Sequence, residues 1–162
     1  MQSIDKMNAA NISTRRSVRQ VLYVTARLIL GAVFIYASFD KIIHPAAFAE
    51  AVYNYQILPD DLINLSAVVL PWAELLLGIV LIAGFWMPGA VALSTLLLTI
   101  FMGAMVFNFA RGLDISCGCF STSASEGPMT VWTILRDAVF LLLAVYLLFA
   151  TFFPKVPLTS DR

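Results

Sequence analysis

The chain has 162 residues, of which 60% are hydrophobic and 12% are charged, and its formal net charge at pH 7 is zero. A soluble domain of this size cannot bury so much apolar surface, so the composition excludes a soluble globular protein and predicts an all-α integral membrane protein. The zero net charge gives no indication of a nucleic-acid partner; the lipid bilayer is the first partner that the sequence predicts.

Four apolar segments are each long enough to cross about 30 Å of hydrocarbon as a helix that rises about 1.5 Å per residue. We therefore predict one four-transmembrane-helix bundle over residues 20–153, with a polar tail at residues 1–19 and a short tail at 154–162. The four predicted spans are residues 20–39, 62–84, 87–110 and 131–153.

The loop between the first two spans contains a short amphipathic segment. Proline disfavours helix at the residue before it, so His44-Pro45 marks a break after the first span. Phe48, Val52 and Tyr55 then recur at helical spacing, which predicts a short interfacial helix. His44 is the only histidine in the chain. It is a candidate base for a nearby thiol, and a capping role at the helix end is the alternative.

The positive charges predict the orientation of the bundle. Lysine and arginine residues that flank a span resist translocation. The residues of this kind before the first span and after the fourth are Lys6, Arg15, Arg16, Arg19, Lys155 and Arg162. We expect both termini in the cytoplasm. The loop between the third and fourth spans then faces outward, which is the periplasmic side if the membrane is a bacterial inner membrane.

Two charged residues lie inside predicted spans, where an unpaired charge costs at least a few kcal/mol. Arg27 is about 10 Å deep from the cytoplasmic side, and Glu74 is about 18 Å below the outer side, by residue count along ideal helices. In a core of about 30 Å these depths nearly coincide, so we predict an Arg27–Glu74 pair. The pair is either a structural clasp or the polar end of a quinone pocket or proton route.

Arg111 and Asp137 form a second candidate pair. Arg111 ends the third span and Asp137 lies near the start of the fourth, at similar depths. Their pairing would anchor both ends of the intervening loop. The alternative is that Arg111 and Arg136 extend their charged ends to the membrane interface.

That loop contains the only two cysteines, Cys117 and Cys119, separated by Gly118. A disulfide across one intervening residue closes a small strained ring, which makes it a better oxidant than an ordinary structural disulfide. So short a loop also removes little unfolded-state entropy, which argues against a purely stabilising bond. Metal binding by the two thiolates and His44 is a weaker alternative, because the sequence offers no fourth zinc ligand, so no metal site is predicted.

Several short motifs occur along the predicted bundle and its outer loops. They are Phe39-Asp40-Lys41, His44-Pro45-Ala46-Ala47-Phe48, Tyr55 to Pro59, Leu70-Pro71-Trp72-Ala73-Glu74, and Arg111-Gly112 leading to Cys117-Gly118-Cys119-Phe120. In these motifs the sequence resembles the MauE family, a methylamine-utilisation group within the DoxX-like four-helix membrane proteins. Ser121 departs from the resemblance, because the family usually has glycine at that position.

The resemblance implies a part in maturing methylamine dehydrogenase, whose small subunit is exported and rich in disulfides. It also implies a periplasmic thioredoxin-like (MauD-like) partner. We expect thiol/disulfide exchange through Cys117 and Cys119 on the periplasmic face of the inner membrane, as in a thiol:disulfide oxidoreductase. With a single cysteine pair, turnover needs a second redox partner, and a membrane quinone near Glu74 is the candidate cofactor. The alternatives are a non-catalytic scaffold that docks a redox partner, and a metal-handling protein.

Overall fold

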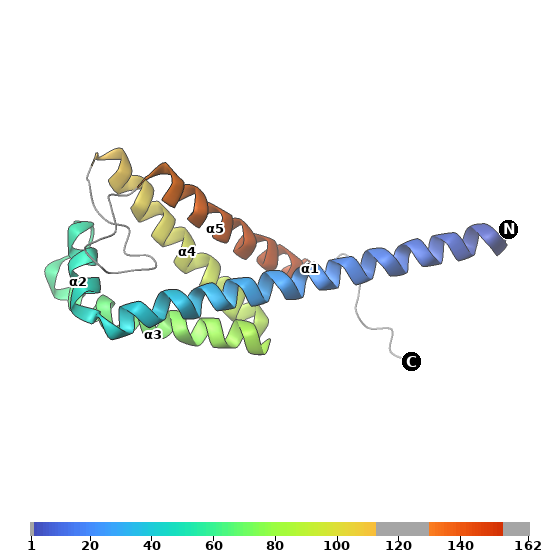
Figure 1. Ribbon diagram of the computed structural model, residues 1–162, viewed down its shortest axis with the longest axis horizontal. Helices are drawn as coiled ribbons and strands as arrows, with labels where there is room; N and C mark the ends of the chain where they lie inside the picture. Colours follow the sequence, from blue (N-terminus) through green and yellow to red (C-terminus); the bar gives the residue numbers. More distant parts are fainter. Residues whose placement is uncertain (1, 113–129, 154–162) are drawn as a thin grey trace.

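The computed structural model describes residues 2–112 and 130–153, and side chains from residue 17 onward within them. Five helices make up this part of the chain (Figure 1): α1 (Gln2–Ile43), α2 (Pro45–Asn54), α3 (Asp60–Ala83), α4 (Met87–Ala110) and α5 (Val131–Phe152). In the described residues, four helical segments are long and apolar enough to cross a membrane: Ser17–Ile43, α3, α4 and α5. The expected all-α, four-helix membrane fold is confirmed, and so is the short helix between the first two spans.

The spans form two antiparallel pairs, α1 with α3 and α4 with α5. A tight turn between Ala83 and Met87 joins the pairs at one end of the bundle, which we call the Gly84 end. From there the two pairs diverge (Figure 1). At the wider end lie α2, the end of α1, the start of α3, the end of α4 and the start of α5; we call this the α2 end.

Two glycines let α1 and α3 approach closely. A Cβ atom built on Gly31 would lie 2.9 Å from the carbonyl oxygen of Gly78, and one on Gly78 would lie 2.8 Å from the carbonyl oxygen of Gly31. Both distances are shorter than side chains tolerate, so the backbones touch only because neither residue has a side chain. This contact fixes the register of α1 against α3.

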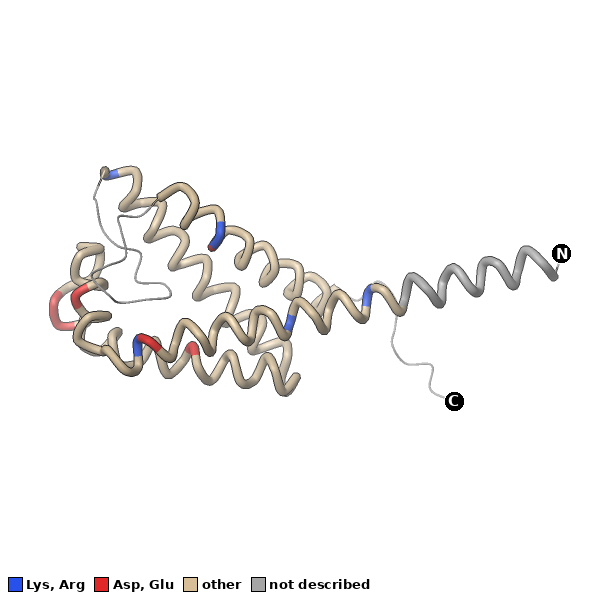
Figure 2. Tube along the Cα trace, viewed as in Figure 1, with Lys and Arg blue, Asp and Glu red and all other residues tan. Residues whose placement is uncertain are grey.

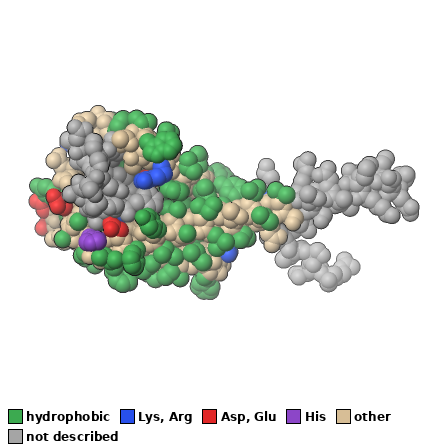
Figure 3. Space-filling view, in the orientation of Figure 1, with side chains coloured by type: hydrophobic (Ala, Val, Ile, Leu, Met, Phe, Trp, Pro, Cys, Tyr) green, Lys and Arg blue, Asp and Glu red, His purple; other side chains and the backbone are tan. Residues whose placement is uncertain are grey.

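The bundle core is nearest the Gly84 end and combines residues of all four spans. Most large apolar side chains lie outside it and are exposed, and hydrophobic side chains cover much of the visible surface of the bundle (Figure 3). Such a surface is stable where the helices face lipid. The buried cluster consists of Ala26, Leu30, Phe34, Leu81, Ala90, Val91, Ala144 and Leu147.

Local sequence signals explain the helix ends at the α2 end. Pro45 occupies the first turn of α2, where its missing N–H costs no hydrogen bond. Asp60 and Asp61 lie in the first turn of α3, where carboxylates favour the helix dipole. The Thr130 side chain accepts a hydrogen bond from the Thr133 N–H at the start of α5.

The first helix is longer than the sequence predicted. α1 begins at Gln2 rather than near residue 20, so the backbone of the predicted polar tail is helical up to the first span. It also continues to Ile43 instead of ending at Phe39. Lys41, which lies beyond the predicted end of the first span, therefore belongs to the last turn of α1.

Candidate functional site

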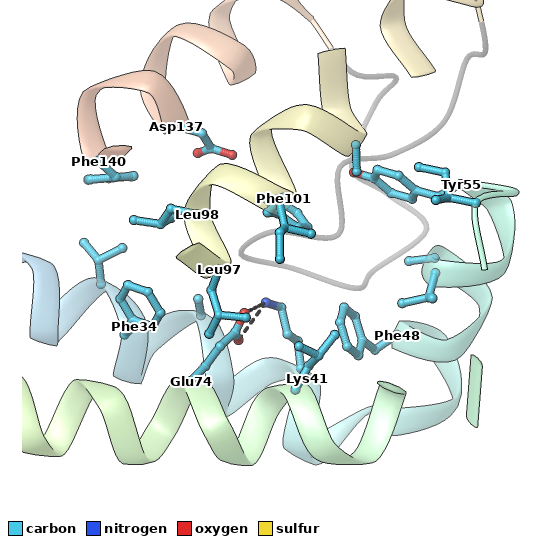
Figure 4. A pocket seen from close by; sticks show the side chains of 18 of the residues that line it. Phe34, Lys41, Phe48, Tyr55, Glu74, Leu97, Leu98, Phe101, Asp137 and Phe140 are labelled. Atoms are coloured by element: carbon cyan, nitrogen blue, oxygen red, sulfur yellow. Dashed lines mark hydrogen bonds and ion pairs between the residues drawn. The ribbon is translucent and has the colours of Figure 1, made fainter. Parts of the chain in front are cut away.

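A cavity of about 240 Å³ lies at the α2 end, lined by all five helices and by the turn after α2 (Figure 4). Most of its wall is apolar or aromatic. Four lining residues carry a charge or a hydroxyl group: Lys41, Tyr55, Glu74 and Asp137. We call it the α2-end cavity. An apolar cavity with a few converging polar groups is the usual form of a small-molecule site.

Lys41 and Glu74 form a bidentate ion pair on one wall of this cavity. The Lys41 Nζ atom lies 2.8 Å from each Glu74 carboxylate oxygen. The Lys41 side chain is 4% exposed and the Glu74 side chain 19% exposed, so the pair is largely shielded. Each charge compensates the other in a region where an isolated charge would be costly.

Aromatic rings complete the surroundings of the Lys41 ammonium group. Its Nζ atom lies 5.1 Å from the ring centre of Phe48 and 5.9 Å from that of Phe101, distances at which a ring face attracts a cation. Phe48 is buried and belongs to α2, and Phe101 belongs to α4. The ammonium group thus connects α1, α2, α3 and α4 at one point.

Asp137 lies on the wall opposite the Lys41–Glu74 pair (Figure 4). It is a buried residue of α5, and its carboxylate accepts a hydrogen bond of 3.0 Å from Arg136 Nε. Tyr55, just after α2, faces the cavity from a third direction. Burial, and then the charge of Asp137, raises the pKa of Tyr55, so its hydroxyl group stays protonated and able to donate a hydrogen bond.

The expected Arg27–Glu74 pair is not formed, because Glu74 is bound by Lys41. Arg27 instead lies at the Gly84 end, where its Nη2 atom is 3.5 Å from the carbonyl oxygen of Ile82. The contact between Gly31 and Gly78 explains the difference. In antiparallel helices, four residues back from Gly31 on α1 correspond to four residues onward from Gly78 on α3, which brings Arg27 beside Ile82 and away from Glu74.

The structure also does not bring Arg111 and Asp137 together. The Arg111 guanidinium donates a hydrogen bond of 3.3 Å to the Gln56 side chain and lies over the Phe107 ring. Asp137 is bound by its neighbour Arg136 instead. Arg111 therefore connects the end of α4 to the turn after α2, which anchors the same end of the bundle by a different contact.

His44 lies between α1 and α2, and its side chain is 58% exposed. Its Nδ1 atom is 3.3 Å from the Asp40 carbonyl oxygen and 3.4 Å from an Asp40 carboxylate oxygen. The residue takes the N-cap position of α2, but its side chain makes no capping hydrogen bond.

Sequence reasoning missed Lys41 and Tyr55 as members of this site. Lys41 follows a long apolar segment and precedes the His44-Pro45 break by only three residues, a spacing that allows it to belong to the last turn of the span. Tyr55 is part of the predicted amphipathic segment and of a family motif, and neither pattern indicates that it faces a cavity. Within the described ranges, no group of three or more histidine, cysteine, aspartate or glutamate residues is placed to hold a metal ion.

Comparison with known proteins identifies the family. The family model described as "Methylamine utilisation protein MauE" matches residues 19–150, which include α3, α4 and nearly all of the first and last spans. The chain belongs to the MauE family. No solved structure gives a significant match to it.

Three curated MauE proteins are similar to the chain. The methylamine utilization protein MauE of Paracoccus denitrificans is 34% identical over 121 residues, which are 74% of this chain and 64% of that protein. The one of Methylophilus methylotrophus is 30% identical over 112 residues, 68% of this chain and 59% of its own length. The one of Methylorubrum extorquens is 32% identical over 91 residues, 56% of this chain and 49% of its own length.

The matched part of the chain thus spans about half to two thirds of these relatives. Like the family to which it belongs, the chain is a MauE-like, multi-pass membrane protein with four candidate spans. Cys117 and Cys119 lie outside the described residues, in the segment that connects α4 to α5 at the α2 end.

Proposed function

We propose that this MauE-family protein supports the maturation of an exported, disulfide-rich enzyme of the methylamine dehydrogenase type by thiol/disulfide exchange at Cys117 and Cys119. The names of its relatives, methylamine utilization proteins, support the pathway. The observation that carries the exchange role is the position of the cysteine pair. The only two cysteines of the chain stand in the sequence between α4 and α5, and the ends of these two helices that flank that segment are at the α2 end, as is the cavity.

The exchange requires no atoms beyond the two cysteines and two partner thiols. A partner thiolate attacks one sulfur of the Cys117–Cys119 disulfide, which breaks the S–S bond and forms a mixed disulfide. The second partner thiolate then releases the chain, so the partner gains a disulfide and the chain holds two thiols. The short ring makes the chain disulfide the stronger oxidant of the two.

We propose that the α2 end faces the periplasm of a bacterial inner membrane and that both termini are cytoplasmic. Glu50 lies in α2, and Asp60 and Asp61 lie in the first turn of α3, so acidic residues gather at the α2 end (Figure 2), where the basic residues are Lys41, Arg111 and Arg136. Arg19 and Arg27 lie on α1 toward the other end. Positive charges are retained on the cytoplasmic side, which supports this orientation. A periplasmic, thioredoxin-like (MauD-like) protein is then the natural partner of the cysteine pair, and the exported enzyme is its client.

His44 is the proposed base for this exchange. Its Nδ1 atom faces two oxygen atoms of Asp40, which favours the tautomer with the proton on Nδ1 and leaves Nε2 as the acceptor. An accessible imidazole at the same end as the cysteine segment is suited to accept a thiol proton.

Replacing both cysteines by serine tests the exchange role. We expect Cys117→Ser/Cys119→Ser to abolish disulfide formation in the client, measured by the mass added when free client thiols are alkylated. Ser121→Ala is the matched control, since it changes the same segment without removing a thiol. If the double variant matured the client normally, the protein would act as a docking scaffold instead. If the purified chain held copper or zinc that the double variant lost, the metal-handling alternative would replace exchange.

The redox potential of the pair provides an independent test. Structural disulfides have potentials below about −300 mV, whereas disulfides that exchange are more oxidising. We expect the pair, equilibrated with glutathione or dithiothreitol in membranes, to titrate above that value. A lower potential would identify a stable structural bond and overturn the exchange role.

A further inference from the structure

We propose that the α2-end cavity binds the ring of a membrane quinone, with Lys41 and Glu74 on one side of the ring and Asp137 on the other. The binding is inferred from the cavity itself. Only its use as an electron acceptor rests on the function proposed above.

The cavity has the size of a substituted six-membered ring. An apolar cavity of about 150 Å³ in a protein interior takes up a benzene molecule. The α2-end cavity, at about 240 Å³, has room for such a ring and several small substituents. It is too small for a long isoprenoid tail, which would have to remain outside.

The edge of the cavity offers a place for that tail. Ile57, Leu58 and Ile100 line the cavity and are 46%, 38% and 61% exposed. Ile100 lies on α4, one of the candidate spans, so this edge is reached from the hydrocarbon side of the protein. A ligand that enters there is lipid-soluble, and its apolar tail can stay among the exposed side chains.

The polar groups of the cavity suit a ring whose oxygen atoms are carbonyl groups in the oxidised form and hydroxyl groups in the reduced form. The Lys41 Nζ atom donates to both oxygen atoms of Glu74, and an ammonium group can donate three hydrogen bonds, so it can also donate to a quinone carbonyl oxygen in the cavity that it lines. The carboxylates of Glu74 and Asp137 can accept from the hydroxyl groups of the reduced ring. Because these groups lie on opposite walls (Figure 4), they match a ring whose two oxygen atoms are at opposite positions.

Aromatic side chains of the cavity provide further contacts for the quinone ring. Phe48 and Phe101 line the cavity beside the Lys41 ammonium group, and Tyr55 lies with its ring centre 6.3 Å from that of Phe101. Such rings favour offset or edge contacts with a flat aromatic ligand. A phospholipid acyl chain would use the apolar wall but would leave the donor and the acceptors without ligand partners.

In the proposed reaction the quinone regenerates the disulfide. The two thiols of Cys117 and Cys119 give up two electrons and two protons and form one S–S bond. The quinone takes up the same two electrons and two protons and becomes a hydroquinone, which leaves through the bilayer.

The test is equilibrium binding of decylubiquinone, a short-tailed quinone, to the full chain in lipid nanodiscs. We expect Ala104→Phe, which fills the cavity from α4, to weaken binding by about tenfold or more, since the ring loses its space. Gly103→Phe is the matched control, because no atom lies within 4 Å of a Cβ at this neighbouring, exposed position. It should bind quinone as the unmodified chain does.

Two further measurements complete the test. Lys41→Met/Glu74→Met removes the charged wall while leaving no unpaired charge, so it should also bind more weakly even where Ala104→Phe fails to fold. An azidoquinone should crosslink to peptides of α2 and α4 that line the cavity. Unchanged binding in both cavity variants, or crosslinks confined to lipid-facing residues, would overturn the proposal.

The cysteine-free chain separates this proposal from the exchange function. Cys117→Ser/Cys119→Ser should bind decylubiquinone as tightly as the unmodified chain, because the proposed ring contacts come from Lys41, Glu74, Asp137 and the apolar wall, and serine is close to cysteine in size. If the unmodified chain binds quinone but the cysteine-free chain still matures the client, the quinone site is retained and the exchange function is rejected. If the cysteine-free chain fails to mature the client but the unmodified chain binds no quinone, the exchange function is retained and the quinone site is rejected.

Discussion

At the scale of single residues, the Lys41–Glu74 pair is the feature on which the candidate site depends. Its two charges lie between membrane helices, and each has the other as its main compensation. Removing one of them leaves the second in a region with few alternatives for solvation. Breaking the pair should therefore lower the stability of the fold whether or not a ligand binds, and this loss can be measured without a ligand.

We expect Lys41→Met to destabilise the protein by about 3 kcal/mol, the lower end of the range for breaking a buried ion pair, because Glu74 is partly exposed. The double variant Lys41→Met/Glu74→Met should recover most of that loss, since no unpaired charge remains. Unfolding in detergent micelles, followed by circular dichroism with added denaturant, measures both. Equal stability of Lys41→Met and the unmodified chain would mean that the pair contributes nothing to folding.

At the scale of elements, the contact between α1 and α3 sets the geometry of the whole site. Gly31 and Gly78 bring the two backbones together, and this register places the last turn of α1 opposite the first half of α3, nearer the α2 end than Glu74. Side chains of a helix point back toward its N-terminus, so in this antiparallel pair Lys41 and Glu74 lean toward each other and meet. α2 follows directly and closes the cavity with Phe48.

Substituting one of these glycines should separate the helices. A Cβ atom on Gly78 would lie 2.7 Å from the Ile35 side chain and 2.8 Å from the backbone oxygen of Gly31, so we expect Gly78→Ala to cost about 1–3 kcal/mol of stability. Gly103→Ala is the control, and it should be neutral or stabilising because alanine favours helix and the position is open. Thermal unfolding of the two variants in the same detergent compares them. Similar melting temperatures would show that α1 and α3 have room to adjust.

At the scale of the whole molecule, the two helix pairs meet at the Gly84 end and diverge toward the α2 end. The core is packed where the pairs meet, and the cavity lies where they have separated. The segment with both cysteines connects α4 and α5 at this same end. The orientation of the bundle in the membrane thus decides which compartment the proposed exchange site serves.

Cysteine labelling tests that orientation. In a chain that lacks Cys117 and Cys119, we introduce either Glu50→Cys on α2 or Ser17→Cys near the start of the first span; both positions are exposed. A membrane-impermeant maleimide should label the α2 variant in intact spheroplasts and should label the other only after permeabilisation. The opposite pattern would place the α2 end in the cytoplasm and remove the basis for a periplasmic partner.

The membrane class, the four spans and the short helix after His44 could all be predicted from the sequence. These follow from apolar length and from proline positions, which act locally and do not depend on the partners of a helix. The sequence also showed that Glu74 and Asp137 are charged residues inside predicted spans, which require a partner. Its motifs indicated the MauE family, to which the family model assigns the chain.

Which charges meet depends on how the helices pack in three dimensions. Counting residues from the predicted span ends placed Arg27 level with Glu74, but α1 extends to Ile43 and its register against α3 is set by two glycines. That register brings Lys41 to Glu74 and leaves Arg27 beside Ile82. The cavity likewise depends on how far the helix pairs diverge. Depth in a membrane is a property of one helix, whereas pairing and cavities are properties of how helices pack, and no local pattern in the sequence specifies that packing.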